Sequence, residues 1–60
     1  MKLSEYLKLI NRKPTKWAAE NGLPTATIWR AYKGIGIPTL PTIKAIEKVT
    51  RGAVKPEDWY

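Results

Sequence analysis

Glycine and proline residues divide the first half of the chain into short segments, and this division constrains the fold more than any other feature. Gly22 stands where a first helix must end and the chain must reverse, because glycine adopts positive φ without steric cost. A second helix cannot begin before Pro24, which has no amide hydrogen, so Thr25 is its expected N-cap and Gly34 its expected end. Thr15 is the expected N-cap of the first helix. The sequence therefore predicts two short helices joined by a tight turn.

Two helices that cross at a steep angle over such a turn form a helix-turn-helix, whose second helix can enter the major groove of DNA. We place this motif at about residues 15–34. A spacing of about 100° per residue groups one set of side chains on the buried side of the second helix: Ile28, Ala31, Tyr32 and Ile35. The opposite side is predicted to be exposed: Ala26, Arg30 and Lys33, with Trp29 and Thr27 on its flanks.

Five residues of the second helix are candidates to read base pairs: Thr25, Ala26, Thr27, Trp29 and Arg30. Arg30 can pair bidentately with guanine O6 and N7, and a threonine hydroxyl can bond to a base edge. The methyl groups of Ala26 and Thr27 can contact the thymine methyl. Trp29 has two open interpretations: it packs along sugars or a thymine methyl, or it folds back onto the first helix.

Two lysines are the candidate phosphate contacts. Lys16 lies near the N-terminus of the first helix, where backbone amides also point toward an anion. Lys33 lies a full turn or more from the tip of the second helix, too far back to read bases there. Each can also be an ordinary surface lysine.

The pair Trp17-Ala18 precedes the turn glycine Gly22, and the step Ile28-Trp29-Arg30 precedes the helix-ending Gly34. This order resembles the helix-turn-helix of the Cro and phage-repressor family. The tail from Ile46 to Val54, followed by Glu57-Asp58, is similar to small Cro-like phage regulators. The matches run from about Thr15 to Asp58. Asn21 departs from the pattern, because the family usually has a buried leucine there.

The resemblance implies a lambda-repressor-like domain that binds double-stranded DNA in a sequence-specific manner and represses transcription by occupying an operator. It also implies the cytoplasm of a bacterial host. A single short recognition helix reads few base pairs, so we expect a homodimer, weak off DNA, on a near-palindromic operator with half-sites about 34–36 Å apart. The alternative is an antitoxin or phage accessory protein that uses the same fold to bind a protein partner.

Apolar periodicity predicts further helices on both sides of the motif. A stripe with helical spacing opens the chain: Leu3, Tyr6, Leu7 and Ile10. A second stripe covers the core from about residue 39, capped by Thr39 with Pro41 in its first turn: Leu40, Ile43, Ile46 and Val49. Gly52 is its expected end, and a last turn near Pro56 carries Trp59 and Tyr60 back to the core or to a second subunit.

We therefore expect one all-α domain over residues 1–60, a compact four- to five-helix unit with its C-terminal helical half at about 39–60. The alternative is an α+β fold with a short C-terminal hairpin, for which several apolar residues give some support: Ile35, Ile37, Val49 and Val54. The three-residue periodicity and two prolines, Pro38 and Pro41, favour helix.

Charge and composition narrow the function classes. The 60-residue chain has a net charge of +6, and residues 1–34 carry seven basic residues against two acidic ones. Positive charge gathered there attracts a polyanion. Without cysteine or histidine the chain lacks a thiol nucleophile, a disulfide and the commonest general base and metal ligand, so we expect no enzyme, cofactor or metal. No apolar run approaches the about 20 residues of a membrane helix, so we expect a soluble protein without a membrane partner.

Overall fold

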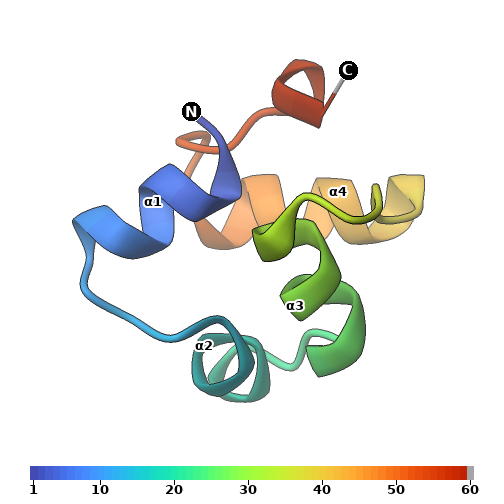
Figure 1. Ribbon diagram of the computed structural model, residues 1–60. Helices are drawn as coiled ribbons and strands as arrows, with labels where there is room; N and C mark the ends of the chain where they lie inside the picture. The colour runs from blue at the N-terminus through green and yellow to red at the C-terminus, as the bar shows by residue number, and fades with distance from the viewer. Residues whose placement is uncertain (60) are drawn as a thin grey trace.

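The computed structural model describes residues 1–59, which form four α-helices and a C-terminal 3-10 helix and contain no strand (Figure 1). The helices are α1 (Leu3–Leu9), α2 (Pro14–Glu20), α3 (Thr25–Lys33), α4 (Leu40–Val49) and η1 (Pro56–Trp59). The predicted all-α class is confirmed, and the hairpin alternative is wrong for this part of the chain. Prolines at 38 and 41 explain the difference, because neither can donate to a strand ladder. Tyr60 lies outside the described residues.

The core forms where α3 packs against both α1 and α2 (Figure 1). Its buried members come from every helix except η1 and from the two connections around Leu23 and Val54: Leu3, Leu7, Trp17, Ala18, Leu23, Ile28, Ala31, Ile46 and Val54. Trp17 is a core residue, and Tyr6 meets it edge to face with ring centroids 6.2 Å apart. Each large apolar side chain buried in this way contributes roughly 1.5–3 kcal/mol. The core therefore holds α3 by one face only.

The expected helix starts at Thr15 and Thr25 are wrong. Lys13 is the N-cap of α2 and Pro24 is the N-cap of α3, and neither helix has a side-chain capping bond. Pro14 explains why α2 begins earlier than expected. The fixed φ of proline suits the first helical position, so the helix begins at Pro14 and not at Lys16. Thr15 and Thr25 are consequently helical residues with exposed side chains. Thr39 does occupy the N-cap of α4.

Two predicted turn glycines are confirmed. Gly22 has φ of 67° and Gly34 has φ of 76°, both in the left-handed region. Behind Gly22, the amide of Leu23 donates to the carbonyl oxygen of Ala18 at 2.9 Å, and the Leu23 side chain is buried. Asn21 stays exposed and its Nδ2 donates to the carbonyl oxygen of Trp17 at 2.8 Å. Leu23 thus fills the space beneath the turn, and Asn21 satisfies the end of α2.

Three apolar residues that the periodicity assigns to the core are exposed instead: Ile10, Ile35 and Leu40. Ile10 follows the end of α1, Ile35 follows the end of α3, and Leu40 is the first residue of α4. An apolar stripe predicts which side chains are buried only within the helix itself. Because these three residues lie at or beyond a helix end, the stripe does not predict their burial. The expected end of α4 at Gly52 is also wrong, because the helix ends at Val49.

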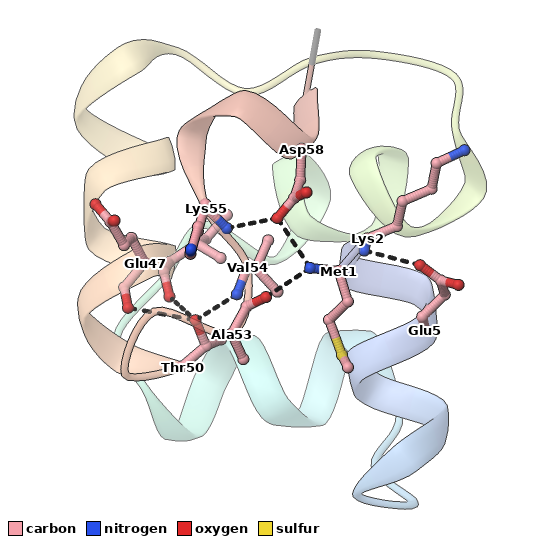
Figure 2. A network of polar contacts seen from close by, with 10 residues as sticks. Met1, Lys2, Glu5, Glu47, Thr50, Ala53, Val54, Lys55 and Asp58 are labelled. Atoms are coloured by element: carbon pink, nitrogen blue, oxygen red, sulfur yellow. Dashed lines mark hydrogen bonds and ion pairs between the residues drawn. The ribbon is translucent and has the colours of Figure 1, made fainter.

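The C-terminal segment is tied to α4 by a buried hydroxyl (Figure 2). Thr50 is almost fully buried, and its Oγ1 donates to the carbonyl oxygen of Ile46 at 2.8 Å. The same oxygen accepts the amide hydrogen of Val54 at 3.1 Å. Val54 is fully buried, and Trp59 packs against the core from η1, which is one of the two alternatives that the sequence leaves open. The Thr50 hydroxyl therefore joins the end of α4 to the segment that packs back on the core.

A second polar cluster joins η1 to the start of α1 (Figure 2). The Asp58 carboxylate accepts the amide hydrogen of Lys55 at 2.8 Å and a hydrogen of the Met1 ammonium at 2.9 Å. The ammonium also donates to the carbonyl oxygen of Ala53 at 2.7 Å. The bond from the Lys55 amide, and after it the bond from the Met1 ammonium, lower the pKa of Asp58 below its ordinary value. The carboxylate is therefore stabilised in its charged form.

Among residues 1–59, no helix has the length and apolar character needed to span a bilayer.

Candidate functional site

A shallow surface hollow lies where the first turn of α2 meets the exposed side of α3. Five side chains line it: Thr15, Thr25, Ala26, Trp29 and Arg30. The last four are predicted base-reading residues, and they come together because positions one, two, five and six of a helix share one face. We call these five residues the α2–α3 face.

Thr15 belongs to this face although the sequence assigned it only a capping role. Because Pro14 occupies the first helical position, Thr15 becomes the second residue of α2, and its side chain is free of any backbone cap. It is exposed and lines the hollow together with Arg30. The preference of proline for the first helical position is the signal that could have placed Thr15 here.

Arg30 is the strongest anion-binding group of the face. It is exposed, and among residues 1–59 no carboxylate lies within 4.0 Å of its guanidinium. Arg12 provides a contrast, because its guanidinium forms an ion pair with Glu20. The guanidinium of Arg30 therefore has all its donors available for a planar acceptor such as a base edge or a phosphate.

Trp29 lies at the surface and not in the core. It is 42% exposed, whereas Trp17 is 5% exposed. The Nζ of Lys33 lies 5.8 Å from the centroid of the Trp29 ring, which is a cation–π distance. Trp29 also lines the hollow beside Thr15 of α2. Its ring therefore lies at the surface between the two helices, with the Lys33 ammonium beside it.

The other predicted site residues lie outside the hollow. Lys16 is exposed on α2, directly after Thr15. Thr27 is half-buried and does not line the hollow, so of the five predicted base readers it is the one set apart. Lys33 does not line the hollow, and its Nζ lies near the Trp29 ring.

The α2–α3 face combines hydroxyl groups, a methyl group, an aromatic ring and a guanidinium. These groups donate hydrogen bonds, make apolar contacts and attract negative charge, and they include no carboxylate. Such a set is suited to binding an anionic surface that also carries apolar groups. No protein-family model, curated protein or solved structure matches this chain.

Proposed function

We propose that this protein is a sequence-specific double-stranded DNA-binding regulator in which α2 and α3 act as a helix-turn-helix. The observation that carries the proposal is the gathering of Thr15, Thr25, Ala26, Trp29 and Arg30 on one exposed face at the N-terminal half of α3. Side chains in this part of a recognition helix are the ones that reach base edges.

The dimensions of α3 suit the major groove. Its nine residues make a rod about 13.5 Å long at about 1.5 Å per residue. The groove is about 12 Å wide and about 8.5 Å deep, so it admits one such helix end. Arg30 is the proposed reader of guanine O6 and N7, and Ala26 the proposed contact of a thymine methyl. Thr25, Thr27 and Trp29 complete the proposed set of base readers.

Positive charge on the same half of the chain supports a DNA ligand. Residues 1–34 carry seven basic residues against two acidic ones, and Glu20 is engaged by Arg12. Lys16 and Lys33 are the proposed phosphate contacts. Contacts of this kind release counterions from the duplex, so binding weakens as salt is added.

The family resemblance of the sequence suggests the biological role. We propose a Cro-like repressor that occupies an operator in the cytoplasm of a bacterial host and blocks transcription by occlusion. Two copies would bind a near-palindromic site, because one short recognition helix distinguishes few base pairs.

The test is selection of bound sequences from a random duplex pool, followed by titration of the selected duplex at several salt concentrations. We expect one sequence to be enriched and the logarithm of the affinity to fall linearly with the logarithm of salt concentration. Lys16→Ala is expected to flatten this slope by about one unit without changing sequence preference. A matched control is Lys44→Ala, which removes an exposed lysine from α4. A pool in which nothing is enriched would overturn the proposal.

A further inference from the structure

The turn between α2 and α3 contains an asparagine followed directly by a glycine, Asn21-Gly22. The chain has one other asparagine, Asn11, and no glutamine. A side-chain amide can be attacked by the backbone nitrogen of the next residue, and a side chain on that next residue hinders the attack. Gly22 has no side chain, whereas Asn11 is followed by Arg12. Asn21 is therefore the asparagine at which its neighbour obstructs the attack least.

The surroundings of Asn21 and Gly22 leave room for this reaction. Both residues are exposed, and a Cβ built on Gly22 would meet no heavy atom within 4 Å. The Gly22 amide donates to the carbonyl oxygen of Ala19 at 3.4 Å, which is long for such a bond. The amide of Leu23, by contrast, donates to the carbonyl oxygen of Ala18 at 2.9 Å. The nitrogen that would attack is thus more weakly held than the next amide of the turn.

The folded turn nevertheless holds the reacting atoms apart. Ring closure joins the Gly22 nitrogen to Cγ of Asn21, so this nitrogen must rotate about the Cα–C bond of Asn21 until it lies beside Cβ. Asn21 has ψ of 8°, close to the helical region, which keeps the nitrogen away from Cβ. Its Nδ2 is also held by the carbonyl oxygen of Trp17 at 2.8 Å. The reaction therefore requires a local opening of the turn.

We propose that Asn21 is a site of spontaneous deamidation whose rate is set by local opening of the turn at Gly22. The Gly22 nitrogen bonds to Cγ of Asn21, the Cγ–Nδ2 bond breaks, and the Gly22 amide proton passes through solvent to the departing ammonia. One water then opens the five-membered succinimide at either of its carbonyl carbons, adding OH to that carbon and a proton to the Gly22 nitrogen. Opening at Cγ gives aspartate, and opening at the backbone carbonyl carbon gives isoaspartate, in which the side chain carries the peptide link.

Either product disturbs the end of α2. The Asn21 amide donates to the carbonyl oxygen of Trp17, but a carboxylate has no hydrogen to donate and brings negative charge to that oxygen. Negative charge is also unfavourable at a helix C-terminus, where the last carbonyl groups are themselves partly negative. Isoaspartate adds one carbon to the main chain just before Gly22, whose φ of 67° forms the turn. We expect both products to loosen the turn that sets α2 against α3.

The experiment follows the full-length protein by mass spectrometry during incubation at neutral pH. Tryptic cleavage places Asn21 in peptide 17–30 and Asn11 in peptide 9–12, so the two amides are followed separately. Replacement of NH by oxygen raises the mass of a peptide, and chromatography separates aspartate from isoaspartate.

We expect peptide 17–30 to gain this mass faster than peptide 9–12. In the folded protein the reaction at Asn21 should be at least about tenfold slower than in the same chain unfolded in urea, a factor that corresponds to an opening free energy of about 1.4 kcal/mol. An Asn21 amide that persists in the unfolded chain as long as that of Asn11 would overturn the proposal. Equal rates in the folded and unfolded chains would also overturn it, because the turn would then not control the reaction.

Leu23→Ala tests the local opening. The Leu23 side chain is buried beneath the turn, so its removal weakens the packing of the turn and leaves Asn21 and Gly22 unchanged. Val54→Ala is the matched control, since it removes a buried apolar side chain from the C-terminal segment. At urea concentrations that give both variants the same free energy of unfolding, Leu23→Ala should deamidate several-fold faster. Equal rates would make global unfolding the controlling step and overturn the local opening. If Leu23→Ala does not fold, the comparison of folded and unfolded wild type decides.

The effect of the product is measured with Asn21→Asp, and Asn11→Asp places the same charge outside the turn. Loss of one hydrogen bond lowers the melting temperature of a small domain by about 4–8 °C. We expect a fall of this size for Asn21→Asp and little change for Asn11→Asp. Equal melting temperatures of Asn21→Asp and wild type would overturn the expected loosening of the turn.

One further readout rests on the proposed function: Asn21→Asp should bind the selected duplex several-fold more weakly than Asn11→Asp does. Mass spectrometry and thermal unfolding need no DNA, so the two proposals can fail separately. A protein that enriches no duplex and deamidates at Asn21 would reject the DNA ligand and retain the modification site. A protein that binds a selected duplex and keeps its Asn21 amide when unfolded would do the reverse.

Discussion

Thr15 of α2 and Arg30 of α3 line the same surface hollow, so the two helices contribute jointly to one face. This arrangement depends on the tight turn at Gly22, which brings the first turn of α2 beside the middle of α3. Under the proposed function, Arg30 supplies a planar donor pair and Thr15 supplies a hydroxyl at its side. Each role can be tested separately.

Replacing Arg30 by alanine is expected to cost about 1–3 kcal/mol in binding to the selected duplex and to relax the preference at one or two base pairs. Arg30→Lys should restore charge but little of the preference, because lysine lacks the bidentate geometry. The measurement is fluorescence anisotropy against a panel of duplexes with single base-pair changes, with Lys44→Ala as the charge-matched control. Equal weakening on every duplex would assign Arg30 to phosphate.

Thr15→Ala distinguishes a cap from a binding residue. Loss of a true N-cap costs about 0.5–2 kcal/mol, but Thr15 lies inside α2 without a capping bond. We therefore expect the free energy of unfolding, measured with urea, to change by no more than about 0.5 kcal/mol. Affinity for the selected duplex should fall by about 0.5–1.5 kcal/mol, the contribution of one hydrogen bond. A large loss of stability with unchanged affinity would restore the capping role.

Thr50→Val is expected to destabilise the protein by about 1–3 kcal/mol, because it leaves the amide of Val54 buried without its acceptor. The hydroxyl is lost while the side-chain volume is nearly preserved, so a cavity does not explain the effect. Urea unfolding followed by circular dichroism gives the free energy. Thr42→Val in α4 is the control, since its hydroxyl forms an exposed hydrogen bond with the Thr39 hydroxyl at the start of the helix.

The environment of Asp58 predicts how the free energy of unfolding changes at acidic pH. Its pKa is lowered in the folded protein, first by the Lys55 amide and then by the Met1 ammonium. A lowered folded pKa means that the carboxylate contributes stability above its unfolded pKa of about 4. This contribution is lost as the pH falls through the lower folded pKa.

The check is urea unfolding from neutral pH to about pH 2. Asp58→Asn should be less stable than wild type at neutral pH, and the difference should shrink below about pH 4. Glu57→Gln is the control, since Glu57 is an exposed neighbour in η1. A difference between Asp58→Asn and wild type that stays constant across the whole range would contradict the assignment.

The order of the helices could be read from the sequence, because apolar periodicity and the turn residues Gly22, Gly34 and Pro56 agree with one another. The starts of α2 and α3 could not. Threonine and proline compete for the N-cap and the first helical position, and here Pro14 begins α2 while Pro24 takes the N-cap of α3 and leaves Thr25 as its first residue. Single-residue boundaries of this kind depend on which of two similar local preferences wins.

The candidate site was predictable only within one helix. Thr25, Ala26, Trp29 and Arg30 share a face by helical periodicity alone, and the structure brings them to one hollow. The part played by Thr15 depends on how α2 packs against α3, which periodicity does not describe. The exposure of Ile35 likewise depends on where α3 ends, and the sequence pattern continued past that point.

Gly34 ends α3 in the left-handed region, with φ of 76°. A Cβ built at this position would meet no heavy atom within 4 Å, so a larger residue would be opposed by backbone strain and not by a steric clash. The place where α3 stops, and with it the length of the helix that carries Arg30, is therefore set by local backbone conformation and not by packing against the rest of the protein.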